Sequence, residues 1–337
     1  MSSIITLVTI IIFPLNFFWI TTPWISDGQN KKNILENYAK EIQGAEKSQE
    51  GLFPKKNPLP PAVLPTKKEA ATDLAIPNAH SSLILDVESG TILHYQNGRE
   101  HRPIASLVKL MTAVIVMERI SNLNEEVTVD EEAVYAEGTK IGCPRSGYCI
   151  SQRLKAGEKI TVSGLLKAML MNSANDAAIA LGKHISGSQE EFAKLMNEKA
   201  RELGLGDSRF CTPSGLEIDG RESECHSSAY DVARIAAYSM KYDLIWHIFR
   251  LPTNTIVTSA DGKYSHTILN TDLVLDQVPN CLGGKTGFTP LAGHSLLLAS
   301  TDPSKKHKIV AVVLDDPYRW QDIKTMVDWA WRSYEWR

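Results

Sequence analysis

The sequence predicts an α/β fold of the α+β kind, in which one antiparallel sheet from N- and C-terminal strands packs against a helical subdomain. Two observations predict it. Segments with strand character stand at residues 80–96 and return at 253–315, whereas the residues between them carry helical periodicity. Strands at both ends with helices between them favour a sheet whose first and last strands meet. The 337 residues suffice for one large domain or two ordinary ones.

The expected strands and helices follow in order along the chain. Residues 80–96, HSSLILDVESGTILHYQ, are typical of two strands around Glu88-Ser89-Gly90, because glycine suits a hairpin turn. A helix is expected to begin near Ser106, where a long apolar run follows. Further helices are predicted at 161–172 with Thr161 as cap, 175–185, 188–206 with a Ser188/Glu191 capping box, and 227–240 capped by Ser227 or Ser228. Further strands are predicted at 253–259, 263–269, 294–300 and 307–315, before a final helix at 322–336.

Two segments precede the expected domain at residues 76–337. Residues 1–26 contain an uncharged stretch, 4–20, about as long as a membrane helix requires. They lack the basic start and the small-residue cleavage site of a signal peptide, so we favour an uncleaved membrane anchor over a cleaved signal. Lys31 and Lys32 oppose export under the positive-inside rule. Residues 27–75, rich in Pro, Lys and Glu, predict an extended linker.

Charge and cysteine content narrow the class of protein. The net charge of −3 gives no sign of a nucleic-acid partner. Of five cysteines, Cys143 and Cys149 bracket one small loop, and Cys211 and Cys225 bracket another. These pairs suit disulfides in an exported protein and leave Cys281 free, while unpaired buried thiols are the alternative. The sequence has no C-x-x-C or H-E-x-x-H, so we expect no metal site, and no cofactor is expected.

Three short stretches bear on chemistry, and each has an ordinary structural explanation. Ser106-Leu107-Val108-Lys109 opens a helix, where a serine is more often an N-cap than a nucleophile. Ser173-Ala174-Asn175 stands in the expected break between two helices, where either polar residue can cap. Lys285-Thr286-Gly287, in GGKTGFT, has the composition of a turn before the strand at 294–300. All three together, in this order and on these elements, are not expected by chance.

The chain resembles the penicillin-binding proteins of the serine D-alanyl-D-alanine carboxypeptidase family, whose signature is S-x-x-K, S-x-N and K-T-G in that order. The resemblance runs from about residue 80 to the C-terminus. It includes ILDVESGTILHYQNGREHRPIASLVKLMTA, LLKAMLMNSANDAAIALG, RFCTPSGL and GGKTGFTPLAGHSLLLA. It implies the fold shared by penicillin-binding proteins and β-lactamases. It also implies peptidoglycan peptides and β-lactam antibiotics as partners, in the bacterial envelope outside the cytoplasm.

The resemblance assigns a role to each matching residue. Ser106 would attack the carbonyl between two D-alanines, after Lys109 as a free amine takes its proton. That requires a depressed lysine pKa, which apolar surroundings and the second cation Lys285 would provide. Ser173 would relay a proton to the leaving amine, and Asn175 would hold the peptide chain. Lys285 and Thr286 would bind the terminal carboxylate, Gly284 and Gly287 would leave room for the peptide, and the N–H groups of Ser106 and Phe288 would form the oxyanion hole.

The sequence departs from many relatives at three places. Where they carry an arginine in an N-R-N-like stretch that helps bind the carboxylate, this chain has Asn270-Thr271-Asp272. The loop bracketed by Cys143 and Cys149 either narrows the cleft or is only a stapled surface loop, and we favour the latter. About 50 residues follow the K-T-G stretch, so we expect no C-terminal β-rich domain, and the N-terminal segment would replace its membrane tether.

Several functions remain open at this point. The first is a D,D-carboxypeptidase, which we favour. The second is a D,D-endopeptidase that uses the same residues on peptidoglycan cross-links. A serine β-lactamase is disfavoured because Glu217 does not stand in an E-x-x-x-N setting. A scaffold with a relic site is disfavoured because the chemical positions are intact.

Overall fold

A computed structural model describes residues 8–13, 16–21, 63–145 and 147–337. The chain divides into two compact units, residues 1–61 and 62–337. In the first, β1 (Val8–Phe13) pairs antiparallel with β2 (Asn16–Thr21). No helix of the described residues is both long and apolar enough to span a bilayer. The anchor expected at residues 1–26 stays a prediction, and it lies partly outside the described residues, as does most of the expected linker.

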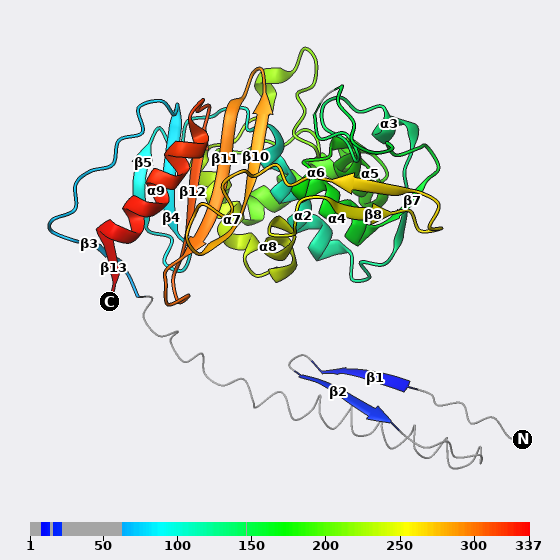
Figure 1. The fold of residues 1–337 in the computed structure, drawn as a ribbon, viewed down its shortest axis with the longest axis horizontal. Helices are drawn as coiled ribbons and strands as arrows, with labels where there is room; N and C mark the ends of the chain where they lie inside the picture. The colour runs from blue at the N-terminus through cyan, green and yellow to red at the C-terminus, as the bar shows by residue number, and fades with distance from the viewer. Residues whose placement is uncertain (1–7, 14–15, 22–62, 146) are drawn as a thin grey trace, which may run out of the picture. The chain divides into compact units, whose positions relative to one another are not determined.

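The second unit is built around a five-stranded antiparallel sheet, in the order β10-β11-β12-β4-β5 (Figure 1). Its strands are β4 (Ser81–Asp86), β5 (Ile92–Gln96), β10 (Cys281–Thr289), β11 (Gly293–Thr301) and β12 (Lys308–Leu314). β12 pairs with β4, so strands from the two ends of the folded unit meet in the middle of the sheet. The predicted fold class and the predicted hairpin of β4 and β5 are confirmed.

Helices cover both faces of this sheet. Successive residues of a strand point to opposite faces. Leu297 and Ala299 of β11 therefore join one apolar core, and Leu296 and Leu298 join another. α9 (Arg319–Ser333) packs on the second face, and α7 (Ala229–Ser239) packs on the first through β4 and β12. Figure 1 shows α9 in front of the sheet and the other helices beside and behind it.

The helical part contains four longer helices beside the β10 end of the sheet (Figure 1). They are α2 (Lys109–Arg119), α4 (Val162–Met171), α5 (Asn175–Ser186) and α6 (Gln189–Glu202). The predicted caps are found: Thr161 accepts from the Gly164 N–H, and Ser188 accepts from the Glu191 N–H. The carboxylate of Glu191 pairs with Lys194 instead, so half of the capping box forms. At α7 the cap is Ser228.

Several short elements were not predicted, because segments of three to seven residues are too short for a clear periodic pattern. They are β3 (Pro65–Lys67), β6 (Glu126–Thr128), α3 (Glu131–Val134), β7 (Lys159–Thr161), η3 (Glu222–Glu224), α8 (Asp243–Phe249) and β13 (Tyr334–Trp336). The predicted strands β8 (Thr255–Thr258) and β9 (Ser265–Ile268) pair with each other, outside the main sheet.

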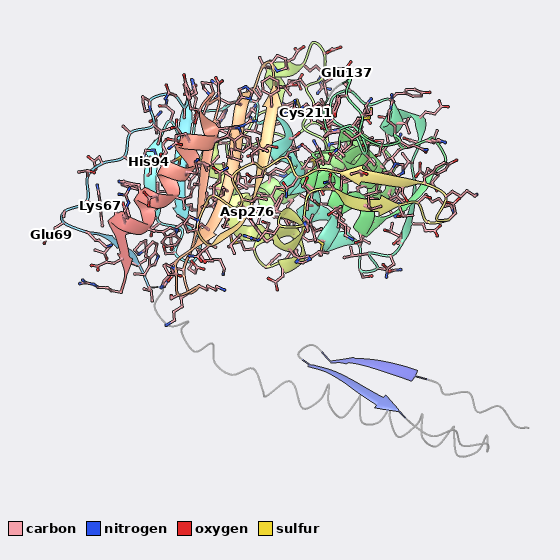
Figure 2. The ribbon with its side chains drawn as sticks, in the orientation of Figure 1. Lys67, Glu69, His94, Glu137, Cys211 and Asp276 are labelled. Carbon is pink, nitrogen blue, oxygen red and sulfur yellow. A yellow bond between two sulfur atoms is a disulfide. The ribbon has the colours of Figure 1, made fainter. Side chains whose placement is uncertain are left out.

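The end of the expected linker packs on the folded unit. β3 pairs with β13, and the last helix, predicted at residues 322–336, instead spans Arg319–Ser333 and so begins and ends three residues earlier. The indole N–H of Trp329 donates to the carbonyl of Thr72 at 2.9 Å. Lys67 and His94 approach the same indole ring from β3 and β5 (Figure 2). Residues 63–75 therefore belong structurally with the domain that we expected to begin at residue 76.

Candidate active site

Ser106 lies in a short 3-10 turn, η2 (Ala105–Val108), that leads directly into α2. The residue before it, Ala105, has φ 47°, in the left-handed region that residues other than glycine rarely adopt. A Cβ on Gly215 would lie 2.1 Å from the carbonyl oxygen of Ala105, so only glycine fits at that position. The backbone next to Ser106 is therefore fixed both by its own turn and by the segment packed against it.

Lys109 is the first residue of α2 and is completely buried. Its Nζ lies 2.8 Å from Oγ of Ser106, one helical turn earlier. It also lies 2.7 Å from Oδ1 of Asn175 and 2.6 Å from the carbonyl oxygen of Ser214. The lysine that stands within an apolar run of the sequence is thus surrounded by three oxygen atoms.

The charge state of Lys109 follows from this environment. Burial holds its pKa well below the ordinary value, the charge of Lys285 lowers it further, and Asp176 opposes both. A neutral amine has two N–H groups and one lone pair. The two carbonyl oxygens beside Nζ can only accept hydrogen bonds, so they take both N–H groups. The lone pair is then left for the hydroxyl proton of Ser106.

Ser173 and Lys285 form a second serine–lysine pair. Ser173 stands between α4 and α5, as predicted, with φ 58°. Its Oγ accepts from Nζ of Lys285 at 2.8 Å, and the same Nζ lies 2.9 Å from the carbonyl of Thr286. Lys285 is 1% exposed. Burial lowers its pKa to about 7, Asp272 opposes that shift, and Arg319 adds to it.

Asn175, at the start of α5, contacts the first serine–lysine pair through Lys109. Its side-chain oxygen accepts from Lys109, while its Nδ2 donates to the carbonyl of Glu137 at 2.7 Å. Its own backbone N–H donates to the carbonyl of Thr139 at 2.8 Å. Glu137 lies in the helical part of the molecule (Figure 2). Because both ends of the amide are bonded, its orientation is fixed with the oxygen toward Lys109.

The K-T-G stretch lies inside β10, not in a turn before the next strand as its composition suggested. β10 is an edge strand of the main sheet, and η2 packs against it. A Cβ on Gly287 would lie 2.9 Å from the carbonyl oxygen of Ile104, so this glycine allows the close approach. The hydroxyl of Thr286 lies 2.8 Å from that of Thr271, and Phe288 is half exposed, stacked on His294.

An arginine that the sequence analysis missed also belongs to this region. Arg319, the first residue of α9, lies 3.1 Å from the carbonyl oxygen of Gly287 and 3.0 Å from Nδ1 of His294 through Nη1. The stretch at 270–272 offers no arginine, but this guanidinium approaches the K-T-G strand from another element. Nothing in the sequence around residue 319 signals this, because only the packing of α9 on the sheet brings it there.

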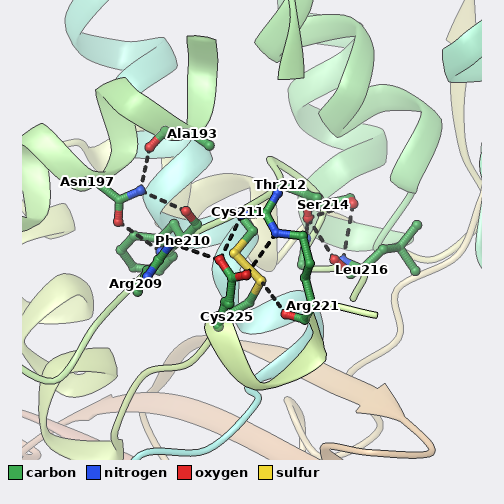
Figure 3. The surroundings of a disulfide bond; sticks show 12 residues. Ala193, Asn197, Arg209, Phe210, Cys211, Thr212, Ser214, Leu216, Arg221 and Cys225 are labelled. Atoms are coloured by element: carbon green, nitrogen blue, oxygen red, sulfur yellow. Dashed lines mark hydrogen bonds and ion pairs between the residues drawn. A yellow bond between two sulfur atoms is a disulfide. The ribbon is translucent and has the colours of Figure 1, made fainter. Parts of the chain in front are cut away.

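A disulfide closes the segment that carries Ser214 (Figure 3). Cys211 and Cys225 are bonded, 14 residues apart, as predicted. Within the segment Thr212 and Ser214 bond to nearby backbone, and Figure 3 shows these contacts on one side of the disulfide. The carbonyl of Pro213 accepts from the hydroxyl of Thr112 on α2 at 2.7 Å. The segment is thus held both to itself and to the helix that begins with Lys109.

The other cysteines also match the predicted pairing. Cys143 and Cys149 form a second disulfide, and Cys281 is a buried free thiol in β10. In residues 63–145 and 147–337, no three histidine, cysteine, aspartate or glutamate side chains are grouped in a way that would hold a metal ion.

The structure brings all the predicted site residues into one region where η2, the α4–α5 junction and β10 meet. Comparison with known proteins identifies the family. Residues 67–318 match the family model described as D-alanyl-D-alanine carboxypeptidase. The chain belongs to this family. The D-alanyl-D-alanine carboxypeptidase family thus accounts for the order of the three motifs that the sequence displays.

Individual relatives within the D-alanyl-D-alanine carboxypeptidase family differ in the activity that their names state. D-alanyl-D-alanine carboxypeptidase DacF of Bacillus subtilis is 31% identical over 262 residues, which cover 76% of this chain and 63% of DacF. The chain thus spans less than two thirds of that relative. A D-alanyl-D-alanine endopeptidase of Pseudomonas aeruginosa is 31% identical over 260 residues, covering 77% of this chain and 76% of the endopeptidase.

A solved structure supports the fold. Penicillin-binding protein D2 of Listeria monocytogenes, in its ampicillin-bound form, is 27% identical to this chain with a TM-score of 0.64. The match covers 77% of this chain and 99% of that one. The expected penicillin-binding-protein fold is confirmed.

Proposed function

We propose that this chain is a serine-type D,D-carboxypeptidase that removes the terminal D-alanine from peptidoglycan stem peptides through an acyl-enzyme on Ser106. β-Lactams would acylate the same serine. Membership of the family, the order of the motifs and the geometry of the two serine–lysine pairs support this function. A relative of the same fold carries bound ampicillin, which supports β-lactams as ligands.

Acylation follows from the contacts of Lys109. As a neutral amine, Lys109 takes the hydroxyl proton of Ser106, and Oγ forms a bond to the carbonyl carbon between the two D-alanines. The C–N bond then breaks as Ser173, which is hydrogen-bonded to Lys285, gives its hydroxyl proton to the leaving amine and receives the proton that Lys109 took from Ser106, so that Lys109 is neutral again and Lys285 keeps its charge. Backbone N–H groups of Ser106 and Phe288 stabilise the oxyanion. Water subsequently hydrolyses the ester and restores the hydroxyl of Ser106.

Substrate binding uses the residues of β10 and its neighbours. The ammonium of Lys285 and the hydroxyl of Thr286 bind the terminal carboxylate, and Arg319 adds positive charge beside the carbonyl of Gly287. Asn175 holds the peptide chain. The space beside Gly284 and Gly287, which we expected to be left for the peptide, is taken by Asp272 and by the turn of Ser106. An extended peptide would instead add along the edge of β10.

The observation that carries the proposal is the 2.8 Å contact between the buried amine of Lys109 and Oγ of Ser106. A labelled penicillin incubated with the full chain is expected to form a long-lived adduct at Ser106, located by mass spectrometry. Ser106→Ala should abolish it, and Ser304→Ala, at an exposed serine in the turn between β11 and β12, should not. Rapid turnover would indicate a β-lactamase, and absence of an adduct would favour a scaffold.

A D,D-endopeptidase is the second candidate, because the chain spans 76% of the Pseudomonas endopeptidase but only 63% of DacF. The chemistry is identical, since the bond cut in a cross-link also follows a D-alanine. Monomeric pentapeptide and cross-linked dimer, each incubated with the full chain, separate the two. Free D-alanine from the first, with the second intact, excludes the endopeptidase.

We also propose that the folded unit works outside the cytoplasm and that residues 1–26 attach it to the membrane. Two disulfides support an oxidising compartment, since such bonds rarely persist in the cytosol. The uncharged stretch at residues 4–20 supports the attachment. The compartment is tested by alkylating free thiols in intact cells and, separately, in cells that have been lysed and reduced. The four paired cysteines should be alkylated only after reduction. Extraction of the chain by detergent but not by salt tests the attachment.

A further inference from the structure

Thr139 contacts both ends of the turn that carries Ser173 and Asn175, although the proposed chemistry assigns it no role. Its hydroxyl donates to the carbonyl oxygen of Ser173 at 2.7 Å. Its own carbonyl oxygen accepts from the backbone N–H of Asn175 at 2.8 Å. The residue before it also fits closely on the turn, because a Cβ on Gly138 would lie 2.8 Å from Nδ2 of Asn175. Thr139 is therefore bonded directly to the residue that would pass the proton to the leaving amine.

The backbone of Ser173 needs such support. Its φ of 58° lies in the left-handed region, which residues other than glycine rarely adopt unless their surroundings impose it. Ser173 is 5% exposed, so its carbonyl needs a donor from within the protein. Thr139 supplies that donor, and the N–H of the same peptide unit, on Ala174, donates to the carbonyl of Ala168 in α4 at 3.2 Å. The peptide unit after Ser173 is thus held at both ends.

The carbonyl and the side chain of Ser173 move together. A change of φ toward an ordinary negative value rotates both of them about the N–Cα bond. Oγ of Ser173 accepts from Nζ of Lys285 at 2.8 Å, and this rotation would carry it away from that position. A hydrogen bond that fixes the carbonyl therefore also fixes Oγ. Thr139 holds that carbonyl from the loop before the Cys143–Cys149 disulfide.

We propose that Thr139 is a positioning residue that acts through Ser173: by holding the carbonyl of Ser173, it keeps Oγ in place to protonate the leaving nitrogen. This rests on the proposed function, in which Ser173 gives its hydroxyl proton to that nitrogen. Thr139 itself touches no reacting atom in this scheme. Its hydroxyl should therefore matter for leaving groups that need a proton and not for those that depart without one.

A leaving nitrogen needs that proton, whereas a leaving sulfur does not. An amide nitrogen departs only when it is protonated, but a thiol has a pKa of about 8.5, so sulfur departs as a thiolate with the electron pair of the broken C–S bond. The probe is an acyl-D-alanyl-D-thiolactate, in which sulfur replaces the nitrogen of the last residue and the terminal carboxylate is kept. Both substrates give the same acyl-enzyme on Ser106, so their kcat/KM values differ only in acylation.

The test is kcat/KM of Thr139→Val for both substrates in the full chain. Valine has nearly the shape of threonine but lacks the hydroxyl. D-Alanine release should fall about tenfold or more, within the usual contribution of proton transfer, and cleavage of the thioester should fall by less than about twofold. Thr139→Ser keeps a hydroxyl and should keep most of the wild-type D-alanine release. An equal loss for both substrates, no loss for either, or failure of serine to preserve the activity overturns the proposal.

The matched control is Thr255→Val, at a threonine of β8 whose hydroxyl also donates to a backbone carbonyl, that of Pro252, at 2.6 Å. It should leave both kcat/KM values unchanged, and a loss equal to that of Thr139→Val overturns the proposal. Absence of D-alanine release by the wild type would refute the proposed function alone. Acylation by penicillin, in which the lactam nitrogen leaves, would then replace D-alanine release in the comparison with the thioester.

A second measurement uses the unmodified chain, in case Thr139→Val does not fold. In a crystal structure of the chain acylated by penicillin, the hydroxyl of Thr139 should remain within hydrogen-bond distance of the Ser173 carbonyl. Oγ of Ser173 should face the nitrogen of the opened ring. If Oγ faces that nitrogen while the hydroxyl of Thr139 has left the carbonyl, the proposal is overturned.

Discussion

The carbonyl oxygen of Ser214 lies 2.6 Å from Nζ of Lys109, although the two residues are 105 positions apart in the chain. This contact matters because a neutral amine has only two N–H groups. With one donated to Ser214 and the other to Asn175, the lone pair of Lys109 has a single remaining direction, toward Ser106. The segment that carries Ser214 therefore orients the base.

Lys109→Arg should abolish most of the acylation. A guanidinium stays protonated at any physiological pH and cannot take the proton of Ser106. The second-order rate of labelling by fluorescent penicillin should fall by about 10²- to 10⁴-fold, the usual contribution of a general base. This labelling rate is measured by stopping the reaction at set times and reading the fluorescence of the protein band on a gel.

The control for this change is Lys194→Arg, at an exposed lysine of α6 paired with Glu191. It should label at the wild-type rate. Because arginine is larger than the buried space of Lys109, Lys109→Ala is tested in parallel, and small primary amines added to the buffer should restore part of its labelling. Full activity in Lys109→Arg would contradict the assignment of Lys109 as the base.

The activity should have a bell-shaped pH profile. The reaction needs Lys109 without its proton and Lys285 with it. The pKa of Lys109 is held well below the ordinary lysine value, so kcat/KM should fall as the pH drops through that lowered pKa. The pKa of Lys285 is lowered to about 7, so kcat/KM should fall again as the pH rises through about 7. A rate that keeps rising to about pH 10, where an ordinary lysine titrates, would be incompatible with this account.

Loss of the Cys211–Cys225 disulfide should lower both stability and activity. Cys211→Ser with Cys225→Ser removes a cross-link that closes a 14-residue separation, which typically contributes about 3 kcal/mol to the free energy of unfolding. Because the segment inside it orients Lys109 through Ser214, kcat/KM should fall as well, at a temperature where the variant is still folded. Denaturant unfolding and D-alanine release measure the two effects.

The second disulfide provides the comparison. Cys143→Ser with Cys149→Ser opens a shorter loop, with a separation of 6, so its loss of stability should be smaller. Neither cysteine contacts Lys109 or Ser214. An equal loss of kcat/KM in both double variants would show that orientation of the base by the Ser214 segment is not the cause.

Much of the fold was predictable because its elements are long and regularly patterned. The strands β4, β11 and β12 show continuous apolar runs, since both of their faces are covered by helices. The caps Thr161, Ser188 and Ser228 follow local rules that need no tertiary information. Pairing of β4 with β12 was predictable in outline from the order of elements alone.

The parts that were missed depend on tertiary contact. The K-T-G stretch has two adjacent glycines and a turn-like composition, yet it forms a strand because pairing with β11 and the approach of η2 require residues without side chains. Arg319 comes to the site only because α9 packs on the sheet. The polar 63–75 segment is held by β13 and by the indole of Trp329, neither of which is visible as a pattern within the segment.

Gly215→Ala should impair the site more than its backbone conformation alone explains. Gly215 has φ 81°, a left-handed value that costs an alanine about 1–2 kcal/mol. Gly187, at the end of α5, has φ 87° and no atom within 4 Å of the position that a methyl group would take, so Gly187→Ala carries the strain without a collision. In Gly215→Ala the new Cβ meets the carbonyl oxygen of Ala105, which must shift together with the turn that holds Ser106.

The two glycine variants are compared by thermal unfolding and by the rate of penicillin acylation. Gly187→Ala should lose stability and keep the wild-type acylation rate per folded molecule. Gly215→Ala should lose more stability and acylate at least about tenfold more slowly, because a displacement of the nucleophile by about 0.5 to 1 Å disturbs its alignment with the carbonyl carbon. If Gly215→Ala acylated as fast as Gly187→Ala, the packing of this segment against the Ser106 turn would have no part in placing the nucleophile.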